Sequence, residues 1–306
     1  MTSGPFLCVC GHTNLDYIIA LERFPPKNTS VDVLEKKLYF GGTAANVATL
    51  ASGLGVPTAL VSYVGSDLPP EFRALMVEKG VDLTDLVEVP GSDTPTVWVM
   101  SDPGHDQIAF VYQGAMGRMD DQEPRLGRAS QASYVHIMTG RPEYYLRMVE
   151  GLRGTGASLA FDPAQEVHHI WRPDPFRRMI RQVEAFFGNE NELRTALGYL
   201  GMERPEQMLE FVNLVVVTKG AKGCLLFTPE ESLHIPSVKA RQVADTTGAG
   251  DAFRAGFYAG RFRGMGLREC AVIGAATSSF VVEERGALTN IPEWQQVRAR
   301  AEPYLQ

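Results

Sequence analysis

The chain has 306 residues, of which 44% are hydrophobic, enough for one large domain or for one domain with a small appendage. Its formal net charge of −7 argues against a broad nucleic-acid surface, which requires an excess of Lys and Arg. The short polar segment at residues 1–5 lacks the features of a signal peptide, and no apolar run approaches the roughly 20 residues of a membrane span. We therefore expect a cytoplasmic protein whose partners include neither nucleic acid nor membrane.

The cysteines indicate free thiols. The chain has four of them and contains neither a CxxC pair nor a zinc-ligand spacing. Cys8 and Cys10 stand two apart in an apolar stretch, so they share one face if that stretch is a strand. Cys224 and Cys270 stand alone. We expect all four to be buried and unpaired.

Strand and helix patterns alternate along most of the chain. Apolar runs of strand length end at Gly or at a polar turn, and they occupy 6–10, 58–64, 134–138, 158–161, 185–188, 214–218 and 224–228. Helical patterns lie between or after them, at 43–54, 71–79, 143–153, 176–182, 192–200, 249–262, 267–282 and 293–304. This order predicts an α/β fold with a mainly parallel sheet flanked by helices.

Two stretches, 16–40 and 94–112, do not fit the alternation and resemble β-hairpins. The strand signals are alternating apolar residues, namely Ile18 and Ala20, Val31 and Val33, Val97 and Val99, and Ile108, Phe110 and Tyr112. Residues 102–104, Asp-Pro-Gly, supply a turn in the second hairpin. We expect a small β-sheet lid built from 16–40 and 94–112, and a large α/β domain built from 1–15, 41–93 and 113–306.

The feature most informative about chemistry is the run DTTGAGD at residues 245–251, followed by an apolar helix. Gly248 and Gly250 around Ala249 allow a close approach of the backbone to a ligand, and the helix N-terminus adds partial positive charge. Such a site suits the negative charge on a phosphoryl group during its transfer, and Asp251 can accept a proton from an attacking hydroxyl. The alternative is a Gly-rich turn whose Asp only complements the helix dipole.

Four segments together resemble the signatures of the ribokinase-like (phosphofructokinase B) kinases. They are GGTAANVA at 41–48, NENE at 189–192, VTKGAKG at 217–223 and the run at 245–251, and they occur in the family's order across the whole chain. The resemblance implies a ribokinase-like fold and a phosphotransferase with an alcohol acceptor. There is no G-x-x-x-x-G-K-[ST] segment, so a P-loop kinase is not indicated.

The resemblance also implies roles for particular residues. Asp251 would be the catalytic base, and Gly248, Ala249 and Gly250 the anion hole. Mg²⁺ would be held by Asn189 and Glu192, mostly through water, and ATP would contact Thr218, Gly220, Gly223 and Asn189. The substrate's hydroxyl groups would be bound by Asn14, Asp16, Gly41, Gly42 and Asn46. Some relatives hold a monovalent cation near Asp245 and Thr247, and the resemblance leaves open whether this chain does.

Further segments resemble the archaeal-type nucleoside kinases, among them GHTNLDYI at 11–18, FPPKNTS at 24–30 and IGAATSSFVVE at 273–283. The chain departs from that branch at 112–116. The resemblance implies an ATP-dependent nucleoside kinase that phosphorylates the ribose 5′-hydroxyl of a small-molecule substrate. Two alternatives remain, a sugar kinase of the ribokinase or fructokinase type and a catalytically inactive ligand-binding protein of the same fold. A nicotinamide-binding enzyme is disfavoured because the first strand ends in Gly-His-Thr.

The residues around the lid support a nucleoside less strongly. An apolar slot for the base requires aromatic side chains, and the candidates, which alternatively form the lid's own core, are Tyr39, Phe40, Phe110 and Tyr112. Gln113 either bonds a base edge or only ends a hairpin. Lys36 and Lys37 are adjacent on a strand and therefore point to opposite faces, which makes them a poor clamp for a sugar phosphate.

Three further features have alternative interpretations. His12 contacts the substrate or is a packed histidine, and Arg254 reaches the phosphates, orients the base or forms a structural ion pair. The pair at 168–169, two histidines, is interpreted as a surface turn rather than a metal site. The chain is expected to be a monomer or a homodimer, and an open lid with unpaired sheet edges would allow dimerisation through the lid.

Overall fold

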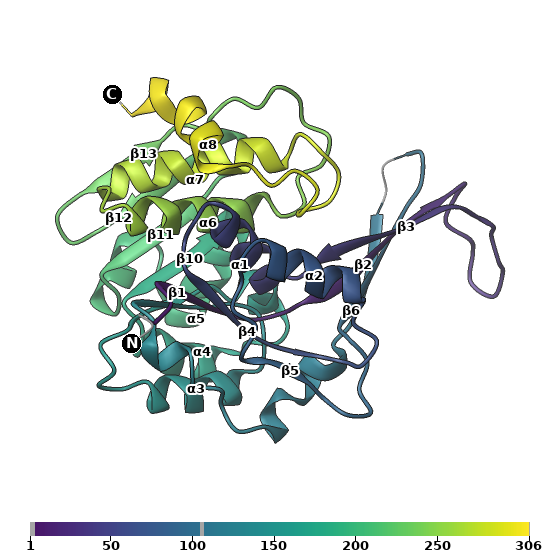
Figure 1. The fold of residues 1–306 in the computed structure, drawn as a ribbon, viewed down its shortest axis with the longest axis horizontal. Coiled ribbons are helices and arrows are strands. Elements are labelled where there is room, and N and C mark those ends of the chain that lie inside the picture. Colours follow the sequence, from purple (N-terminus) through teal and green to yellow (C-terminus); the bar gives the residue numbers. More distant parts are fainter. Residues whose placement is uncertain (1–3, 105–106, 306) are drawn as a thin grey trace.

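The computed structural model describes residues 4–104 and 107–305, and Figure 1 shows its two sheets. The larger sheet has nine strands in the order β13-β12-β11-β10-β9-β8-β1-β4-β5. Its members are β1 (Leu7–Cys10), β4 (Thr58–Val64), β5 (Leu86–Glu88), β8 (Tyr134–Ile137), β9 (Ser158–Phe161), β10 (Ala185–Asn189), β11 (Leu214–Thr218), β12 (Cys224–Phe227) and β13 (Ser232–Ile235). The seven strands from β11 to β5 run parallel; β12 is antiparallel to β11, and β13 is antiparallel to β12 and so runs in the direction of the seven.

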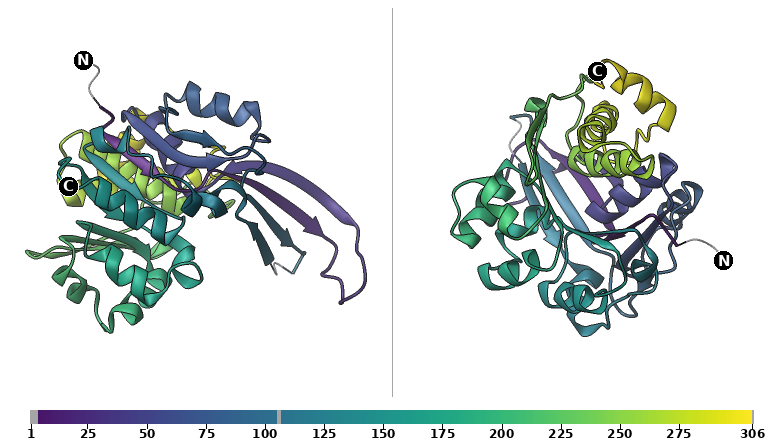
Figure 2. Two further views of the ribbon diagram at one scale, coloured as in Figure 1. Left: turned by 90° about the horizontal axis from the view of Figure 1, so that it is seen from below. Right: turned by 90° about the vertical axis from the view of Figure 1, so that its left-hand side faces the viewer.

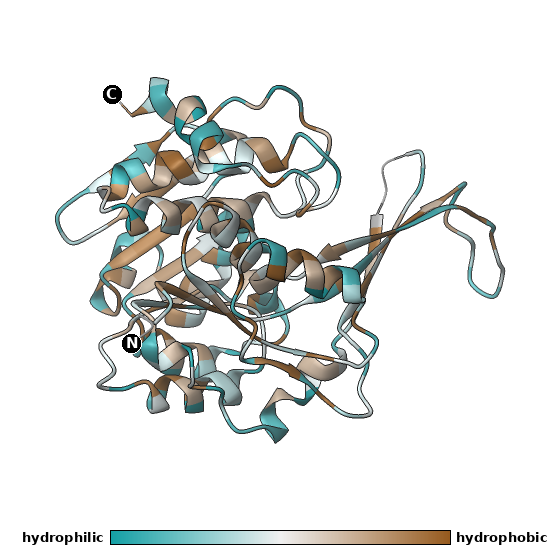
Figure 3. Cartoon of the chain, in the orientation of Figure 1, coloured by the Kyte–Doolittle hydropathy of each residue, from teal (hydrophilic) through white to brown (hydrophobic). Residues whose placement is uncertain are grey.

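Helices cover both faces of this sheet, as Figure 2 shows. One face packs against α1 (Thr43–Gly53), α2 (Pro70–Glu78), α6 (Ala249–Phe262), α7 (Leu267–Val281) and α8 (Trp294–Ala301). The other packs against α3 (Pro142–Gly151), α4 (Pro173–Ile180) and α5 (Glu190–Leu200). The central strands, buried on both sides, are mostly hydrophobic, as the brown arrows of Figure 3 indicate.

Strand β1 illustrates why both faces need apolar residues. Leu7 and Val9 belong to the core under α1 and α6, whereas Cys8 and Cys10 belong to the core under α3 and α4. The predicted shared face of the two cysteines is therefore confirmed. All four cysteines of the chain are buried and free, as expected.

The smaller sheet projects from the body at the right of Figure 1 and has the order β3-β2-β6-β7. Its strands are β2 (Asn14–Leu21), β3 (Val33–Gly41), β6 (Thr96–Ser101) and β7 (Gln107–Tyr112). The two predicted hairpins are present, but Val31 lies outside the strands. A register shift between Ala20 and Leu21 brings Leu21 opposite Val33, where β3 begins, and at the other end the ladder continues to the pair of Asn14 with Gly41.

The predicted α/β alternation and mainly parallel sheet are confirmed, with small differences in bounds. Two short edge strands, β5 and β13, give too few residues for a pattern and were not predicted. Helix α4 begins at Pro173 rather than near 176, because proline is favoured in the first turn. Among the helices in the described residues, none is both long and apolar enough to cross a membrane.

Candidate active site

The candidate site lies at the carboxyl ends of the parallel strands. His12 follows β1, Thr139 follows β8 and Asp162 follows β9, while Asn189 and Thr218 are the last residues of β10 and β11. The carboxyl ends of parallel strands share one edge of a sheet, and open α/β sheets bind ligands there. This edge therefore gathers residues that are far apart in sequence.

Asp251 lies in the first turn of α6, shortly after the Gly248 N-cap. Gly248 has a φ of 73°, and a Cβ added there would lie 2.3 Å from the Cβ of Ala287, so only glycine fits. The Nδ2 of Asn46 donates to Oδ2 of Asp251 at 2.8 Å. Desolvation raises the pKa of Asp251 to about 7, although the hydrogen bond from Asn46 lowers it. A carboxyl that titrates near neutrality is suited to general-base catalysis.

The backbone around Asp251 offers free amide groups. The amide of Ala252 donates to the carbonyl of Gly248 at 2.8 Å, and that of Ala249 donates to Thr246 at 3.2 Å. Within the described part of the chain, the amides of Gly248, Gly250 and Asp251 have no such acceptor. Free N–H groups at the positive end of a helix bind anions. Of the three residues predicted for the anion hole, Gly248 and Gly250 thus have free amides, while that of Ala249 is already bonded.

Three buried acceptor atoms near the junction of β2 and α1 have no donor in the described structure. Asn14, Asp16 and Asn46 each keep an Oδ1 atom to which nothing in the described structure donates. Desolvation also raises the pKa of Asp16 to about 7. Buried acceptors without donors are unfavourable, and hydroxyl groups of a ligand would satisfy them. Asn46 belongs to this group and also bonds Asp251, so it joins the two parts of the site.

The glycines predicted for this pocket are required by close contacts. A Cβ on Gly41 would lie 2.0 Å from Oδ2 of Asp16, and one on Gly42 would lie 2.4 Å from the carbonyl oxygen of His12. Gly42 also has a φ of 98°. The structure thus brings all five residues predicted for hydroxyl binding together at the junction of β2, β3 and α1.

A chain of buried polar side chains lies beside these residues. Oγ1 of Thr43 is 2.7 Å from Oγ1 of Thr139, which is 2.8 Å from Nδ1 of His12. Nε2 of His12 is 2.8 Å from Oε1 of Gln113, whose Nε2 donates to Glu166 at 3.2 Å. Because Oε1 of Gln113 only accepts, Nε2 of His12 is the donor in that bond.

These hydrogen bonds bear on two of the predictions. His12 is a packed histidine with both ring nitrogens hydrogen-bonded inside the protein. The substrate contact of Gln113 stays a prediction, and the amide already holds two internal bonds. Glu166, a buried carboxylate that also accepts from the amide of Gly140, was not predicted. It lies in a short 3-10 turn at 164–168, where no periodicity distinguishes it from a surface residue.

The strand register places the aromatic candidates on different faces of the small sheet. Directly paired residues share a face, and Tyr39 pairs with Asp16. Phe40 pairs with Leu15 on the opposite face, where its ring stacks on Phe72 at 4.5 Å. Phe110 and Tyr112 also lie on that opposite face, through their pairs in β6. The prediction of a base slot lined by all four aromatic residues is therefore wrong. Of the four, only Tyr39 shares the face of Asp16.

A cavity of about 360 Å³ joins the predicted nucleotide loop to the anion hole. Thr218, Gly220 and Gly223 line it on one side, and Ala249 and Gly250 line it on the other. Its remaining wall is largely apolar and includes Val243, Phe253, Ala275 and Val282. An apolar cavity with a free-amide helix end suits a flat aromatic group that carries phosphates.

Asn189 and Glu192 form the capping box of α5. Oδ1 of Asn189 accepts from the amides of Asn191 and Glu192 at 2.8 and 3.0 Å, and Oε2 of Glu192 accepts from the amide of Asn189 at 2.7 Å. No cluster of three or more His, Cys, Asp or Glu residues suited to a metal occurs among the described residues. This donor set fits only a Mg²⁺ ion whose other ligands are water and phosphate oxygens.

The loop that begins at Asp245 is fixed by hydrogen bonds. Oδ1 of Asp245 accepts from the amide and the hydroxyl of Thr247 at 2.9 and 2.8 Å, and Oδ2 accepts from the amide of Gly286 at 3.1 Å. Burial raises the pKa of Asp245, but these bonds outweigh it and hold the pKa below its ordinary value. The carboxylate therefore shapes the loop that precedes the anion hole.

Lys36, Lys37 and the histidines at 168–169 contact other protein groups or solvent in this structure. Lys36 lies over the ring of Tyr17 at 4.4 Å, and Lys37 pairs with Glu35 at 2.7 Å. The strand register places the two lysines on opposite faces, as predicted. The histidines at 168–169 are exposed at the end of a 3-10 turn, as predicted.

Comparison with known proteins shows the family. The chain belongs to the pfkB family of carbohydrate kinases, whose model matches residues 5–294. It is thus a phosphotransferase that uses an alcohol group as acceptor, as predicted.

Particular relatives are similar over nearly the whole chain. A nucleoside kinase of Methanocaldococcus jannaschii is 36% identical over 97% of this chain and 96% of its own. A nucleoside kinase of Methanothermobacter thermautotrophicus is 36% identical over 96% and 94%. The crystal structure of the Methanocaldococcus jannaschii nucleoside kinase superposes with a TM-score of 0.91 at 35% identity, covering 98% of this chain and 99% of that chain. The predicted ribokinase-like fold is confirmed.

Proposed function

We propose that the protein is an ATP-dependent nucleoside kinase, which transfers the γ-phosphate of ATP to the 5′-hydroxyl of a ribose. One observation carries the proposal: Asp251 follows Gly250, which lines the apolar cavity, and it bonds Asn46, which is one of the residues with an unsatisfied acceptor. The cavity suits the nucleotide, and the acceptors suit the ribose hydroxyls. Relatives 36% identical over nearly the whole chain are nucleoside kinases.

The geometry supports an in-line transfer. Asp251 accepts the proton of the 5′-hydroxyl while that oxygen bonds to the γ-phosphorus. The bond from the γ-phosphorus to the β–γ bridging oxygen breaks, and ADP leaves with that electron pair. The free amides of Gly248, Gly250 and Asp251 stabilise the negative charge on the transferring group. Asn46 orients the base through its hydrogen bond.

Mg²⁺, bound to the phosphates, would be positioned by water held on Asn189 and Glu192 and would neutralise phosphate charge. The small sheet would act as the lid. Its strand β2 carries Asn14 and Asp16, so binding of the ribose is linked to the position of the sheet. Closure over the substrate would exclude water from the reaction.

A sugar kinase is the second candidate, because the same acceptors would bind a free sugar. A sugar phosphate is less suitable. Lys36 and Lys37 are engaged with Tyr17 and Glu35 and lie on opposite faces, so they form no phosphate clamp. A nucleoside also has a base, and Tyr39 on the face of Asp16 offers an aromatic surface for it.

A coupled ADP-release assay with Mg-ATP tests the substrate. The acceptors are the four common ribonucleosides, their 2′-deoxy forms, ribose, fructose and fructose 6-phosphate. We expect the highest kcat/KM with ribonucleosides and a loss with the 2′-deoxy forms, which lack a hydroxyl for Asp16. Turnover restricted to free sugars would replace the nucleoside proposal by the sugar-kinase one. No turnover with any acceptor would favour an inactive binding protein.

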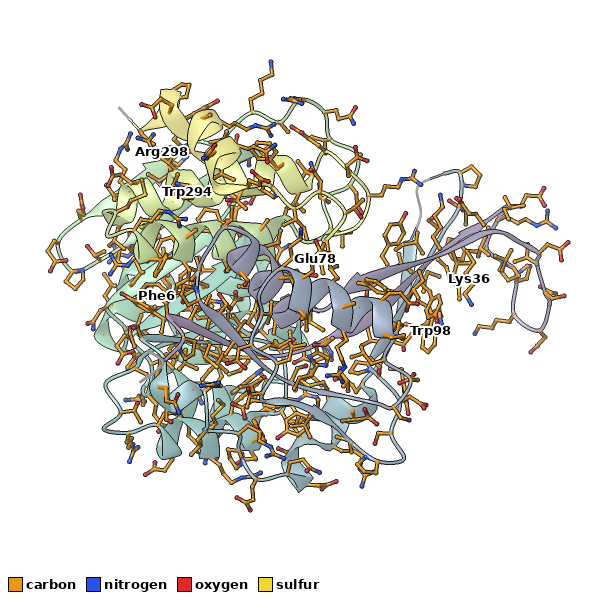
Figure 4. All side chains as sticks on the ribbon, in the orientation of Figure 1. Phe6, Lys36, Glu78, Trp98, Trp294 and Arg298 are labelled. Carbon is orange, nitrogen blue, oxygen red and sulfur yellow. The ribbon has the colours of Figure 1, made fainter. Side chains whose placement is uncertain are left out.

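We further propose that two copies associate through the small sheet. Its apolar outer face, defined as Leu38, Trp98, Ile108 and Phe110, lies opposite the face of Asp16. Phe110 is 52% exposed and Ile108 is 46% exposed. Figure 4 labels Trp98 on this projecting sheet. A second copy would cover an apolar surface that is unfavourable in water.

A further inference from the structure

A closed ring of buried polar side chains ties the first turns of α6 to the central sheet. Nε of Arg254 donates to Oδ2 of Asp162 at 2.6 Å, and Oδ2 of Asp162 is 3.3 Å from Nε2 of His136. Nδ1 of His136 is 2.9 Å from the hydroxyl of Tyr258, which returns to α6 one turn after Arg254. Asp162 and His136 are fully buried, and Arg254 is 5% exposed.

The ring also reaches the backbone beside the catalytic base. Nη1 of Arg254 donates to the carbonyl oxygen of Gly250 at 3.1 Å. A Cβ on Gly250 would lie 2.9 Å from this same Nη1, so the guanidinium occupies the space of a side chain. The peptide unit is planar, so fixing the carbonyl of Gly250 fixes the amide and the Cα of Asp251. Arg254 thus fixes the position of the free amide of Asp251 and, through the Cα, the position of its carboxyl group.

A purely stabilising role explains this ring less well. Burying an ion pair is often no better for stability than well-packed apolar side chains. Oδ1 of Asp162 is buried and has no donor in the described structure, which a network selected for stability alone would avoid. Burial raises the pKa of Asp162, but Arg254 and His136 lower it by a larger amount, so the pKa lies below its ordinary value. Asp162 and Arg254 are therefore an ionised pair.

We infer that Arg254, held by Asp162, is a positioning residue for phosphoryl transfer that orients the Gly250–Asp251 peptide toward the transferring group. The inference rests on the proposed kinase activity. Arg254 acts through its bond to the Gly250 carbonyl and through its charge, which lowers the pKa of Asp251. Its loss leaves the nucleotide cavity and the ribose acceptors in place and misplaces the base and one amide, so it lowers kcat rather than raising KM.

The test compares Arg254→Met with Arg261→Met. Arg261 lies two turns further along α6, where it bonds the hydroxyl of Tyr134 away from the site, and it serves as the matched control. We expect Arg254→Met to lower kcat roughly 10²-fold, with the KM values for ATP and nucleoside changed less than about threefold. Arg254→Lys keeps the charge but not the two-pronged geometry, and we expect it to recover only part of kcat.

A second measurement does not depend on turnover. ADP with aluminium fluoride and a nucleoside mimics the transferring group, and calorimetry measures its binding. We expect Arg254→Met, or Arg254→Lys if the first variant does not fold, to bind ADP as the wild type does and to lose at least tenfold in affinity for the mimic. Folded Arg254 variants with wild-type kcat and wild-type binding of the mimic would overturn the inference. If the wild type turns over no acceptor, the proposed function fails instead, and the comparison of mimic binding still decides the role of Arg254.

Discussion

At the scale of single residues, two carboxyl groups of the site should dominate the pH dependence. Desolvation raises the pKa of both Asp16 and Asp251 to about 7. Asp251 must be ionised to accept the proton of the attacking hydroxyl, and Asp16 must be ionised to accept hydrogen bonds from the ribose hydroxyls. The pH dependence of kcat/KM reports the free enzyme. We predict that log kcat/KM falls below pH 7 with a slope that approaches two. In Asp16→Asn the slope should approach one, and an unchanged slope in that variant would contradict the assignment.

The raised pKa of Asp251 also affects stability. Its ordinary pKa is about 3.9, so between about pH 4 and pH 7 the folded protein retains a proton that the unfolded chain loses. The free energy of unfolding therefore decreases as pH rises through this window. We predict from urea denaturation that the free energy of unfolding of Asp251→Asn exceeds that of the wild type by roughly 2–4 kcal/mol at pH 8. The two free energies should converge near pH 4. Equal stability at pH 8 would show that the carboxyl is not desolvated.

Single residues also show what sequence reasoning can reach. Asp251 is predicted from the glycine-rich run at 245–251, and Asn14 and Asp16 from the resemblance of their segment to the family's substrate-binding residues. Glu166 and Asp162 were not predicted as site residues, since each meets its partners only through the fold. Asp162 is 92 residues from Arg254, and Glu166 is 53 from Gln113. No local spacing records such contacts.

At the scale of elements, the turn between β11 and β12 should control nucleotide binding. Gly223 has a φ of 86°, and a Cβ on it would lie 2.0 Å from the carbonyl oxygen of Ile235 in β13. Gly201, after α5, has a similar φ of 70° but open space around it. We predict that Gly223→Ala raises the KM for ATP at least ~10-fold, because β13 must move at the cavity wall. Gly201→Ala also places alanine at a positive φ, and it should leave that KM unchanged.

A control outcome separates strain from position in this pair. Gly201→Ala places alanine in the left-handed region, whereas Gly223 has a ψ of −136° that alanine adopts much less readily, so Gly223→Ala should lower the melting temperature more. If Gly201→Ala raises the KM for ATP as much as Gly223→Ala does, general destabilisation rather than the shape of the cavity explains the effect.

The elements themselves were largely predictable, and the reasons are physical. Apolar runs that end at glycine predict buried parallel strands, and the long helices α6 and α7 have clear starts and ends. The register of the small sheet was not predictable, because a shift between Ala20 and Leu21 interrupts the regular pairing of β2 with β3. Register decides faces, so the predicted aromatic slot failed for Phe40, Phe110 and Tyr112.

At the scale of the whole molecule, the projecting sheet should decide the oligomeric state. Phe110 lies on the apolar outer face, and its neighbour Val111 is similarly exposed but on the opposite face. We predict that sedimentation of the wild type gives about twice the chain mass of 33.6 kDa. Phe110→Glu should give a monomer and Val111→Glu a dimer. A monomeric wild type, or a dimer that persists in Phe110→Glu, would contradict association through this face.

The proposed reaction depends on one residue, Asp251, which connects the proposed nucleotide site to the proposed hydroxyl-binding site. Asp251 follows Gly250, which lines the proposed nucleotide cavity, and it bonds Asn46, one of the proposed hydroxyl acceptors. The decisive experiment is therefore the turnover of Asp251→Asn with Mg-ATP and a ribonucleoside, with ADP binding measured by calorimetry as the control for folding. We predict a loss of kcat of roughly 10²–10⁴-fold with ADP affinity unchanged. A kcat within tenfold of the wild type would contradict Asp251 as the base.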